Sequence, residues 1–157
     1  MKSFRKFITE KDDFEITHTG YHGTPDARDI LKNGFKTKKE QFGSKDDAAI
    51  HWATPDYQVA HSYADDKRAF DYQNAEPKTL PVELRMKNPK EIYWGGKKFH
   101  DKDADGNWHH INHHIEQARK DGHDGFVIHR IIDTYNAKGK PSTIMGVFDS
   151  NNIRVKK

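Results

Sequence analysis

The most apolar run of the chain, residues 125–133 (GFVIHRIID), constrains the fold more than any other segment. Its length and its β-branched and aromatic residues predict a strand that is buried at the centre of a sheet. Large apolar residues are scarce elsewhere, because Leu, Ile, Val and Phe together account for 29 of the 157 residues. Three Trp and six Tyr add side chains that can fill a core. We therefore expect one domain, over residues 14–157, packed around this strand.

The charges of the chain nearly cancel, since 27 Lys and Arg accompany 24 Asp and Glu and leave a formal net charge of +3. This balance argues against a strong DNA-binding field, although a local basic face is compatible with it. The chain contains no cysteine, which excludes disulfides, thiolate metal sites and thiol catalysis. No apolar run approaches the roughly 18 residues of a membrane span, so no membrane partner is expected.

The patterns of apolar and turn-forming residues predict short strands with helices between them. Residues 24–26 and 54–56 are both TPD, which is typical of a helix start with Thr as N-cap, Pro at the first helical position and an acid in the first turn. Helices are expected after both triplets and over residues 108–120, and a charged loop over residues 97–107. Strands are predicted at residues 14–21, 50–53, 79–87, 92–94, 143–149 and 153–155. This order of elements predicts an α+β domain.

The first candidate binding motif is residues 21–24 (YHGT). Here a strand would deliver His22 into a turn at Gly23 and then to a helix N-terminus. The imidazole and the Thr24 hydroxyl can bond sugar hydroxyls, glycine permits close approach of a ligand, and a helix N-terminus suits an anion. An ordinary strand–turn–helix connection with an exposed histidine would explain the same four residues.

The second motif is residues 50–55 (IHWATP), which Tyr63 follows on the next predicted helix. Tyr63 shares a helix face with Val59 and Ala60, so packing alone accounts for it. Its ring would also suit stacking on a flat heterocycle.

Four histidines gather in residues 109–114 (HHINHH). On a helix, His109 and His113, and likewise His110 and His114, would have the i, i+4 spacing of metal ligands. No glutamate lies between them as it does in the zinc-protease motif. A solvated helix end is the simpler interpretation, with no resident metal. A metal-dependent nuclease or hydrolase built on this cluster is the third functional hypothesis.

Two carboxylates flank the predicted central strand. Asp124, with Gly125, is typical of a turn that leads into the strand. Asp133 lies at the far end of the strand, beside a loop, where it is either a catalytic group or a turn former.

Taken in order, these motifs resemble the ADP-ribosyltransferase superfamily of the diphtheria-toxin and poly-ADP-ribose-polymerase type, and within it the small phage and prophage branch. The resemblance covers about residues 20–155. It rests on residues 21–24 with 31–35 (LKNGF), 50–54 with Ala60 and Tyr63, 81–84 (PVEL), 88–89 (NP), 122–128 and 146–153. It implies a split β-sandwich of two small sheets with flanking helices, which binds NAD as substrate in the cleft.

The resemblance also implies roles for individual residues. His22 would hold the nicotinamide ribose, the backbone of Gly23 would grip the carboxamide, and Tyr63 would stack on the nicotinamide. His51 matches the second position of the family's catalytic triad, which is usually Tyr. The full set implied to contact NAD is His22, Gly23, Thr24, Trp52, Tyr63, Asp124 and Ile144.

The third triad position of the family, usually a glutamate, matches Ile144 in this sequence. The missing acid matters, because cleavage of the nicotinamide–ribose bond develops positive charge that a carboxylate stabilises, and loss of a comparable group costs about 10²–10³ in rate. Relatives from the phage branch often carry an Asp just after the strand that Asp-Gly opens, and Asp133 matches that Asp. Asp133 is therefore the expected substitute acid, with Glu83 as a poorer candidate. The expected catalytic residues are His22, His51 and Asp133.

Residues 1–10 (MKSFRKFITE) resemble the capsid-targeting peptide of internal head proteins in T-even-type phages, which a prohead protease cuts after Leu/Ile-x-Glu. The resemblance implies packaging in the phage head, contact with the head scaffold and protease, and injection into the host cytoplasm. Alternatively, Phe4, Phe7 and Ile8 form the apolar stripe of a short helix that docks on the domain.

Two functional hypotheses follow from the resemblance. The first is mono-ADP-ribosyl transfer from NAD to a host protein or nucleic acid. The second is an inactive transferase fold that binds NAD, a related nucleotide or a host protein.

Overall fold

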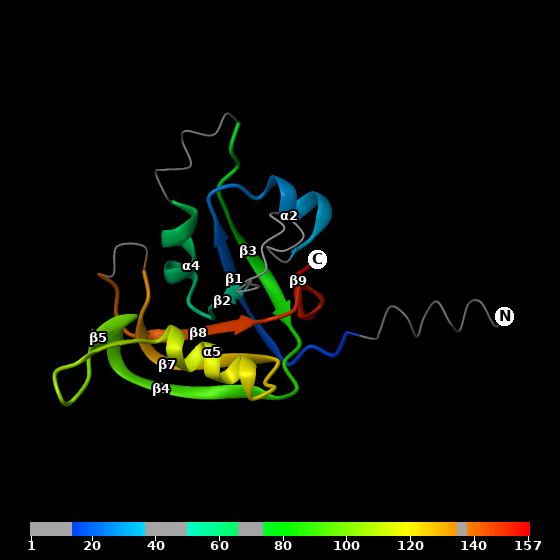
Figure 1. The fold of residues 1–157 in the computed structure, drawn as a ribbon. Coiled ribbons are helices and arrows are strands. Elements are labelled where there is room, and N and C mark those ends of the chain that lie inside the picture. Colours follow the sequence, from blue (N-terminus) through cyan, green and yellow to red (C-terminus); the bar gives the residue numbers. More distant parts are fainter. Residues whose placement is uncertain (1–13, 37–49, 66–73, 135–137) are drawn as a thin grey trace.

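The computed structural model describes residues 14–36, 50–65, 74–134 and 138–157, so the N-terminal segment of residues 1–10 lies outside the described residues. In these ranges strands predominate (Figure 1). The helices are α2 (Arg28–Asn33), α4 (Tyr57–Ala64) and α5 (Asn112–Lys120), with a 3-10 turn η2 (Ser150–Asn152). The strands are β1 (His18–Thr24), β2 (His51–Ala53), β3 (Lys78–Leu84), β4 (Pro89–Lys98), β5 (His100–Lys102), β6 (Trp108–His110), β7 (Gly125–Ile132), β8 (Ser142–Val147) and β9 (Ile153–Val155).

β7 is an interior strand of a four-stranded sheet with the order β2-β8-β7-β4. It pairs antiparallel with β8 and parallel with β4. Phe126 and Ile128 pack in a cluster that includes Ile115 of α5. Val127 packs in a second cluster, which includes Leu84 of β3. The strand is apolar without alternation because both of its faces are covered, so the predicted buried central strand is confirmed.

A second, three-stranded sheet has the order β1-β3-β9 and antiparallel pairing throughout. Figure 1 shows β1 and β3 running across the direction of β8, β7 and β4. The outer strands of the two sheets meet at one bridge, where Tyr21 N–H donates to Thr54 O at 2.7 Å and Thr54 N–H donates to Tyr21 O at 3.0 Å. The described residues therefore form a mixed fold of small sheets and helices, as the order of the predicted strands and helices indicates.

β1 lies directly against α4, and Gly23 makes this contact possible. A Cβ at Gly23 would overlap the backbone carbonyl of Ala60. Strand and helix backbones can touch only because residue 23 has no side chain. His22 and Gly23 therefore belong to the strand itself, which corrects the prediction that they form a turn after it.

The first TPD triplet starts its helix later than predicted. Thr24 is still part of β1 and pairs with Lys78 of β3. Its hydroxyl donates to the carbonyl oxygen of Asp26 at 3.1 Å, which closes a turn, and α2 begins only at Arg28. Thr24, which local composition favours as an N-cap, is thus held in the sheet by strand pairing and does not cap α2.

The second triplet differs in the same way. Asp56, and not Thr54, is the N-cap of α4, and its carboxylate accepts the N–H groups of Gln58 and Val59. Thr54 is held by the bridge to β1 and donates its hydroxyl to Thr143 O at 2.7 Å.

The segment from β4 to α5 departs most from the prediction. β4 is ten residues long where only residues 92–94 were expected, because it pairs with β7 on both sides of an irregularity in register. The predicted charged loop contains the end of β4 and all of β5. Residues 108–110 form β6, so α5 begins at Asn112 and not at residue 108. β5 and β6 are short strands that stabilise each other by pairing, which helical periodicity does not reveal.

We expect Gly23→Ala to lower the free energy of unfolding by about 3 kcal/mol, the upper end of the usual cost of overpacking, because the new methyl group meets backbone and not a flexible side chain. Urea unfolding followed by circular dichroism measures the change. Thr19→Ala, at an exposed position of the same strand, is the matched control and should cost less than about 1 kcal/mol. Equal stability of the two variants would contradict the close contact of β1 and α4.

Candidate functional site

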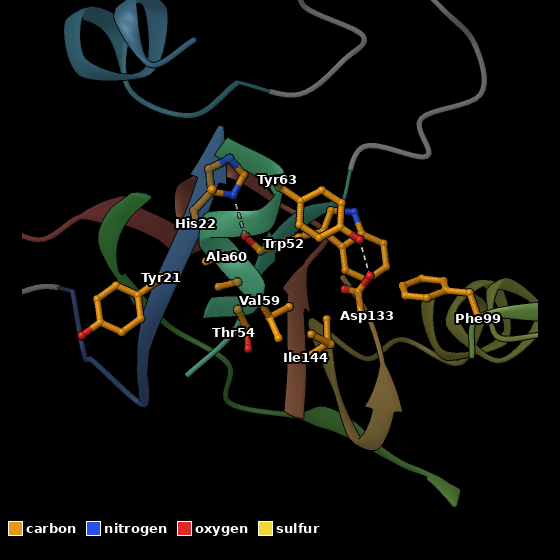
Figure 2. Close-up of a pocket in the computed structure, with 12 residues that line it drawn as sticks. Tyr21, His22, Trp52, Thr54, Val59, Ala60, Tyr63, Phe99, Asp133 and Ile144 are labelled. Atoms are coloured by element: carbon orange, nitrogen blue, oxygen red, sulfur yellow. Dashed lines mark hydrogen bonds between the residues drawn. The ribbon is translucent and has the colours of Figure 1, made fainter. Parts of the chain in front are cut away.

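A pocket of about 260 Å³ lies where the two sheets separate beyond the Tyr21–Thr54 bridge. Its size is just below the roughly 300–1,000 Å³ of sites for drug-sized ligands, so it suits a ring system with part of an attached group. β1, β2, α4, β8 and the residues after β4 and β7 contribute to it (Figure 2). Its lining consists of Tyr21, His22, Gly23, Trp52, Ala53, Thr54, Val59, Ala60, Tyr63, Phe99, Asp133 and Ile144.

The edge of β1 presents the peptide group of Gly23 to this pocket. Along a strand, the N–H and C=O groups of residues i and i+2 point to the same edge. Tyr21 directs both of its groups to Thr54, away from β3. Gly23 therefore directs its N–H and C=O to the same side, where it lines the pocket. A donor and an acceptor on one residue can pair with the two ends of a primary carboxamide.

His22 spans the gap between the two sheets. Its Nδ1 lies 2.7 Å from Trp52 O, and because a carbonyl only accepts, Nδ1 carries the proton. Burial lowers the pKa of His22. The ring is thus neutral near pH 7, with Nε2 left as a hydrogen-bond acceptor. Such an acceptor suits a sugar hydroxyl, which can donate to it.

Tyr63 and Asp133 meet across the pocket, as Figure 2 shows. The Tyr63 hydroxyl donates to Asp133 Oδ1. Only 7% of Asp133 is exposed, and burial raises its pKa to about 6, against the opposing effect of the Tyr63 hydrogen bond. Burial and the neighbouring carboxylate raise the pKa of Tyr63, so its hydroxyl keeps its proton. At neutral pH the site thus holds one buried carboxylate beside one phenol donor.

Aromatic and aliphatic side chains form the walls. The rings of Trp52 and Phe99 lie 5.8 Å apart, centre to centre. Ile144 of β8 lines the pocket and is buried. Phe99, which lies between β4 and β5, belongs to none of the motifs predicted from the sequence. Its one local signal is that it is the only apolar residue in the charged stretch from residue 97 to residue 103.

The pocket brings together six of the residues predicted from the sequence, and three others lie elsewhere. Thr24 is tied to the turn before α2. His51 is buried, with its ring 5.8 Å from Phe35. Asp124 accepts the backbone N–H groups of Lys87 and Asn88 at 2.6 and 3.1 Å, which joins two strand ends. The six that line the pocket are His22, Gly23, Trp52, Tyr63, Asp133 and Ile144.

Glu83, the poorer candidate for the acid, also lies outside this pocket. Its carboxylate pairs with Arg154 of β9 at 3.1 Å.

The histidine cluster is arranged differently from a helical metal motif. His109 belongs to β6 and His114 to α5, so the predicted i, i+4 spacing on one helix is wrong. Their Nε2 atoms lie 2.6 Å apart, in a hydrogen bond packed beside Trp94. Among the described residues, no three His, Asp or Glu side chains are grouped so that they could hold a metal ion. In the same part of the chain, no helix has both the length and the apolar character needed to cross a membrane.

Comparisons of the chain with protein-family models, with curated proteins and with solved structures find no match.

The raised pKa of Asp133 makes stability depend on pH. An unfolded aspartate loses its proton near the ordinary value of 3.8, whereas the folded protein keeps it until about pH 6. The stability that the neutral carboxyl contributes is therefore full below about pH 4 and is lost as the pH rises through about 6. Asp133→Asn is neutral at every pH. Relative to wild type, its free energy of unfolding should be unchanged near pH 4 and higher by up to about 3 kcal/mol above about pH 7.

Urea unfolding of both proteins across this pH range measures the difference. Comparing the two proteins at the same pH cancels the contributions of the groups that they share. Asp121→Asn, at an exposed position after α5, is the matched control and should give no such trend. A difference between Asp133→Asn and wild type that does not change with pH would contradict the buried, proton-binding carboxyl.

Proposed function

We propose that this protein is a mono-ADP-ribosyltransferase that uses NAD as substrate. The observation that carries the proposal is the convergence of the Gly23 peptide edge, the ring of Trp52 and the buried Asp133 carboxylate on one pocket between two sheets. This combination suits a flat carboxamide ring attached to a sugar. The resemblance of the ordered motifs to the superfamily points to the same substrate.

The chemistry requires one bond to break and one to form. The bond between C1′ of the ribose and the nicotinamide nitrogen breaks, and its electron pair neutralises the departing nicotinamide. Positive charge develops on the ribose, where an ionised Asp133 stabilises it. A nucleophile of the acceptor then bonds to C1′ and loses its proton to Asp133 or to solvent.

Other residues of the pocket would position NAD for this step. Nε2 of His22 accepts a hydrogen bond from a ribose hydroxyl, while the peptide of Gly23 pairs with the carboxamide. The Tyr63 hydroxyl orients the Asp133 carboxylate through its hydrogen bond. The rings of Trp52 and Phe99 keep water from the developing charge.

Ile144 supports a second candidate, an inactive fold that binds NAD or a related nucleotide. It is an aliphatic wall of the pocket at the position where the superfamily usually has a glutamate. This candidate predicts saturable binding of NAD, measured by calorimetry, without release of nicotinamide. Release of nicotinamide faster than from NAD without protein would rule out this inactive candidate.

The acceptor of the ADP-ribose and the place where the protein acts are also part of this proposal. A host protein or nucleic acid would receive the ADP-ribose after the protein leaves the phage head. Cleavage by the prohead protease after Glu10 stays a prediction, because residues 1–10 lie outside the described residues.

Nicotinamide release from labelled NAD, with and without host lysate, tests the enzyme proposal. Asp133→Ala should slow release by about 10²–10³-fold, because it removes the only stabilising charge proposed. His22→Ala should also slow release, because it removes the proposed hydrogen bond to the ribose. Asp121→Asn, which also removes a carboxylate, is the control and should match wild type. If wild type releases no nicotinamide and transfers no label, the enzyme proposal is wrong.

The rate should also follow the ionisation of Asp133. Since its pKa is raised to about 6, kcat/KM should rise about tenfold per pH unit below that value and level off above it. Asp133→Ala should lose this inflection. An inflection that persists in Asp133→Ala would assign the titration to another group.

A further inference from the structure

A small two-stranded ribbon, β5 with β6, extends from the end of β4 beside the pocket. His100 pairs with His110, and Lys102 pairs with Trp108. Because side chains alternate along a strand, these four share one face of the ribbon, while Asp101 and His109 occupy the other. We call the first face, made by His100, Lys102, Trp108 and His110, the ribbon face.

The ribbon face combines exposed rings with positive charge. Trp108 is 66% exposed. The Lys102 ammonium lies 5.1 Å from the centre of its ring, and the His100 ring lies 5.0 Å from it. The four residues include no carboxylate. The nearby Asp103 binds the backbone N–H groups of Asp105 and Asn107 within the turn between the strands.

The ribbon face leads to the carboxylate of the proposed site. A hollow of about 360 Å³ is lined by Lys98, His100, Ile132 and Thr134, together with residues that also line the pocket. The shared residues are Tyr63, Phe99 and Asp133. Asp133 therefore lies between two openings, one toward the Gly23 edge and one toward the ribbon. If NAD fills the first opening, the acceptor reaches C1′ through the second.

We propose that the acceptor is a single-stranded nucleic acid, which binds along the ribbon face and presents a base at Asp133. This inference rests on the proposed function. Single strands are bound by aromatic side chains that stack on bases and by cations that contact the phosphates. The ribbon face supplies the Trp108 ring for stacking and the Lys102 ammonium for a phosphate.

Transfer to a base forms one bond and breaks one bond, as transfer to any acceptor does. A ring nitrogen or exocyclic amine of the base forms the new bond to C1′ of the ribose. Nicotinamide leaves with the electron pair of the broken bond, and the base loses one proton to Asp133 or to solvent.

Fluorescence anisotropy of a labelled single strand of about 16 nucleotides, with the full chain and without NAD, tests the ribbon face separately from the chemistry. Wild type should bind. Trp108→Ala should weaken binding about tenfold, and Trp108→Phe should restore much of it, because a ring can still stack. Lys102→Ala should reduce the salt dependence by about 0.7 in the log–log slope, the contribution of one phosphate contact on a single strand.

Two matched controls remove an exposed aromatic ring and an exposed ammonium group outside the ribbon face. Tyr93 is 78% exposed on β4 and stacks on His129 at 4.8 Å, as Trp108 contacts His100. Lys120 ends α5 and is exposed. Tyr93→Ala and Lys120→Ala should bind the strand like wild type. Equal losses in the controls and the ribbon variants, or no binding by wild type, would overturn the proposal.

Polyglutamate of similar charge is the competing probe. If it binds the ribbon face in preference to the nucleic acid, the acceptor is an acidic protein segment and the proposal is overturned. With NAD added, Trp108→Ala should still release nicotinamide while losing transfer to the strand. Unchanged transfer in that variant would overturn the ribbon face as the acceptor site but not the enzyme. Absence of release in every variant, wild type included, would instead overturn the proposed function.

Discussion

The bridge between Tyr21 and Thr54 is the interaction on which the rest of the structure depends. It joins the outer strands of two sheets by two backbone hydrogen bonds. If β1 and β2 continued to pair, Gly23 would lie opposite Trp52 and no pocket would exist. Instead the strands separate, and the imidazole of His22 spans the gap to Trp52 O. The pocket thus follows directly from a sheet contact that stops after one bridge.

Separated strand edges expose backbone groups that pairing would normally satisfy. At this site the exposed edge is enclosed by α4, which approaches closely because Gly23 lacks a side chain. The enclosure also buries Asp133 and raises its pKa to about 6. One packing arrangement therefore explains both the hydrogen-bonding edge and the perturbed carboxylate, the two features that a site for charge-developing chemistry requires.

The carboxylate also connects two regions with different chemistry. Toward β1 the surroundings are aromatic and uncharged, which suits a flat ring held by its carboxamide. Toward the β5–β6 ribbon the surroundings combine the ring of His100 with the ammonium groups of Lys98 and, on the ribbon itself, Lys102. The proposed transfer would use this asymmetry, because a donor and an acceptor must approach the same atom from different sides.

The sequence by itself determined the elements whose signals are local. The apolar run of residues 125–133 predicts β7, since only a strand covered on both faces lacks alternation. Gly34 follows the last residue of α2, Asn33, and has a positive φ of 75°, as is common for a glycine that ends a helix. The order of short motifs also placed six of the pocket's residues among the candidates. These signals depend on neighbours in the chain, so periodicity and turn chemistry reveal them.

Only the tertiary structure decided where pairing with distant residues overrides local preference. Thr24 and Thr54 are used by strand contacts, although composition favours both as N-caps. β5 and β6 form because they pair with each other, and β6 takes the first three residues of the helix predicted over residues 108–120. Phe99 lines the pocket although no motif predicted it. Asp124, which was predicted to contact NAD, instead bonds the backbone before β4. The physical reason is the same in each case: a hydrogen bond or packing contact across the fold outweighs a local propensity of less than about 1 kcal/mol.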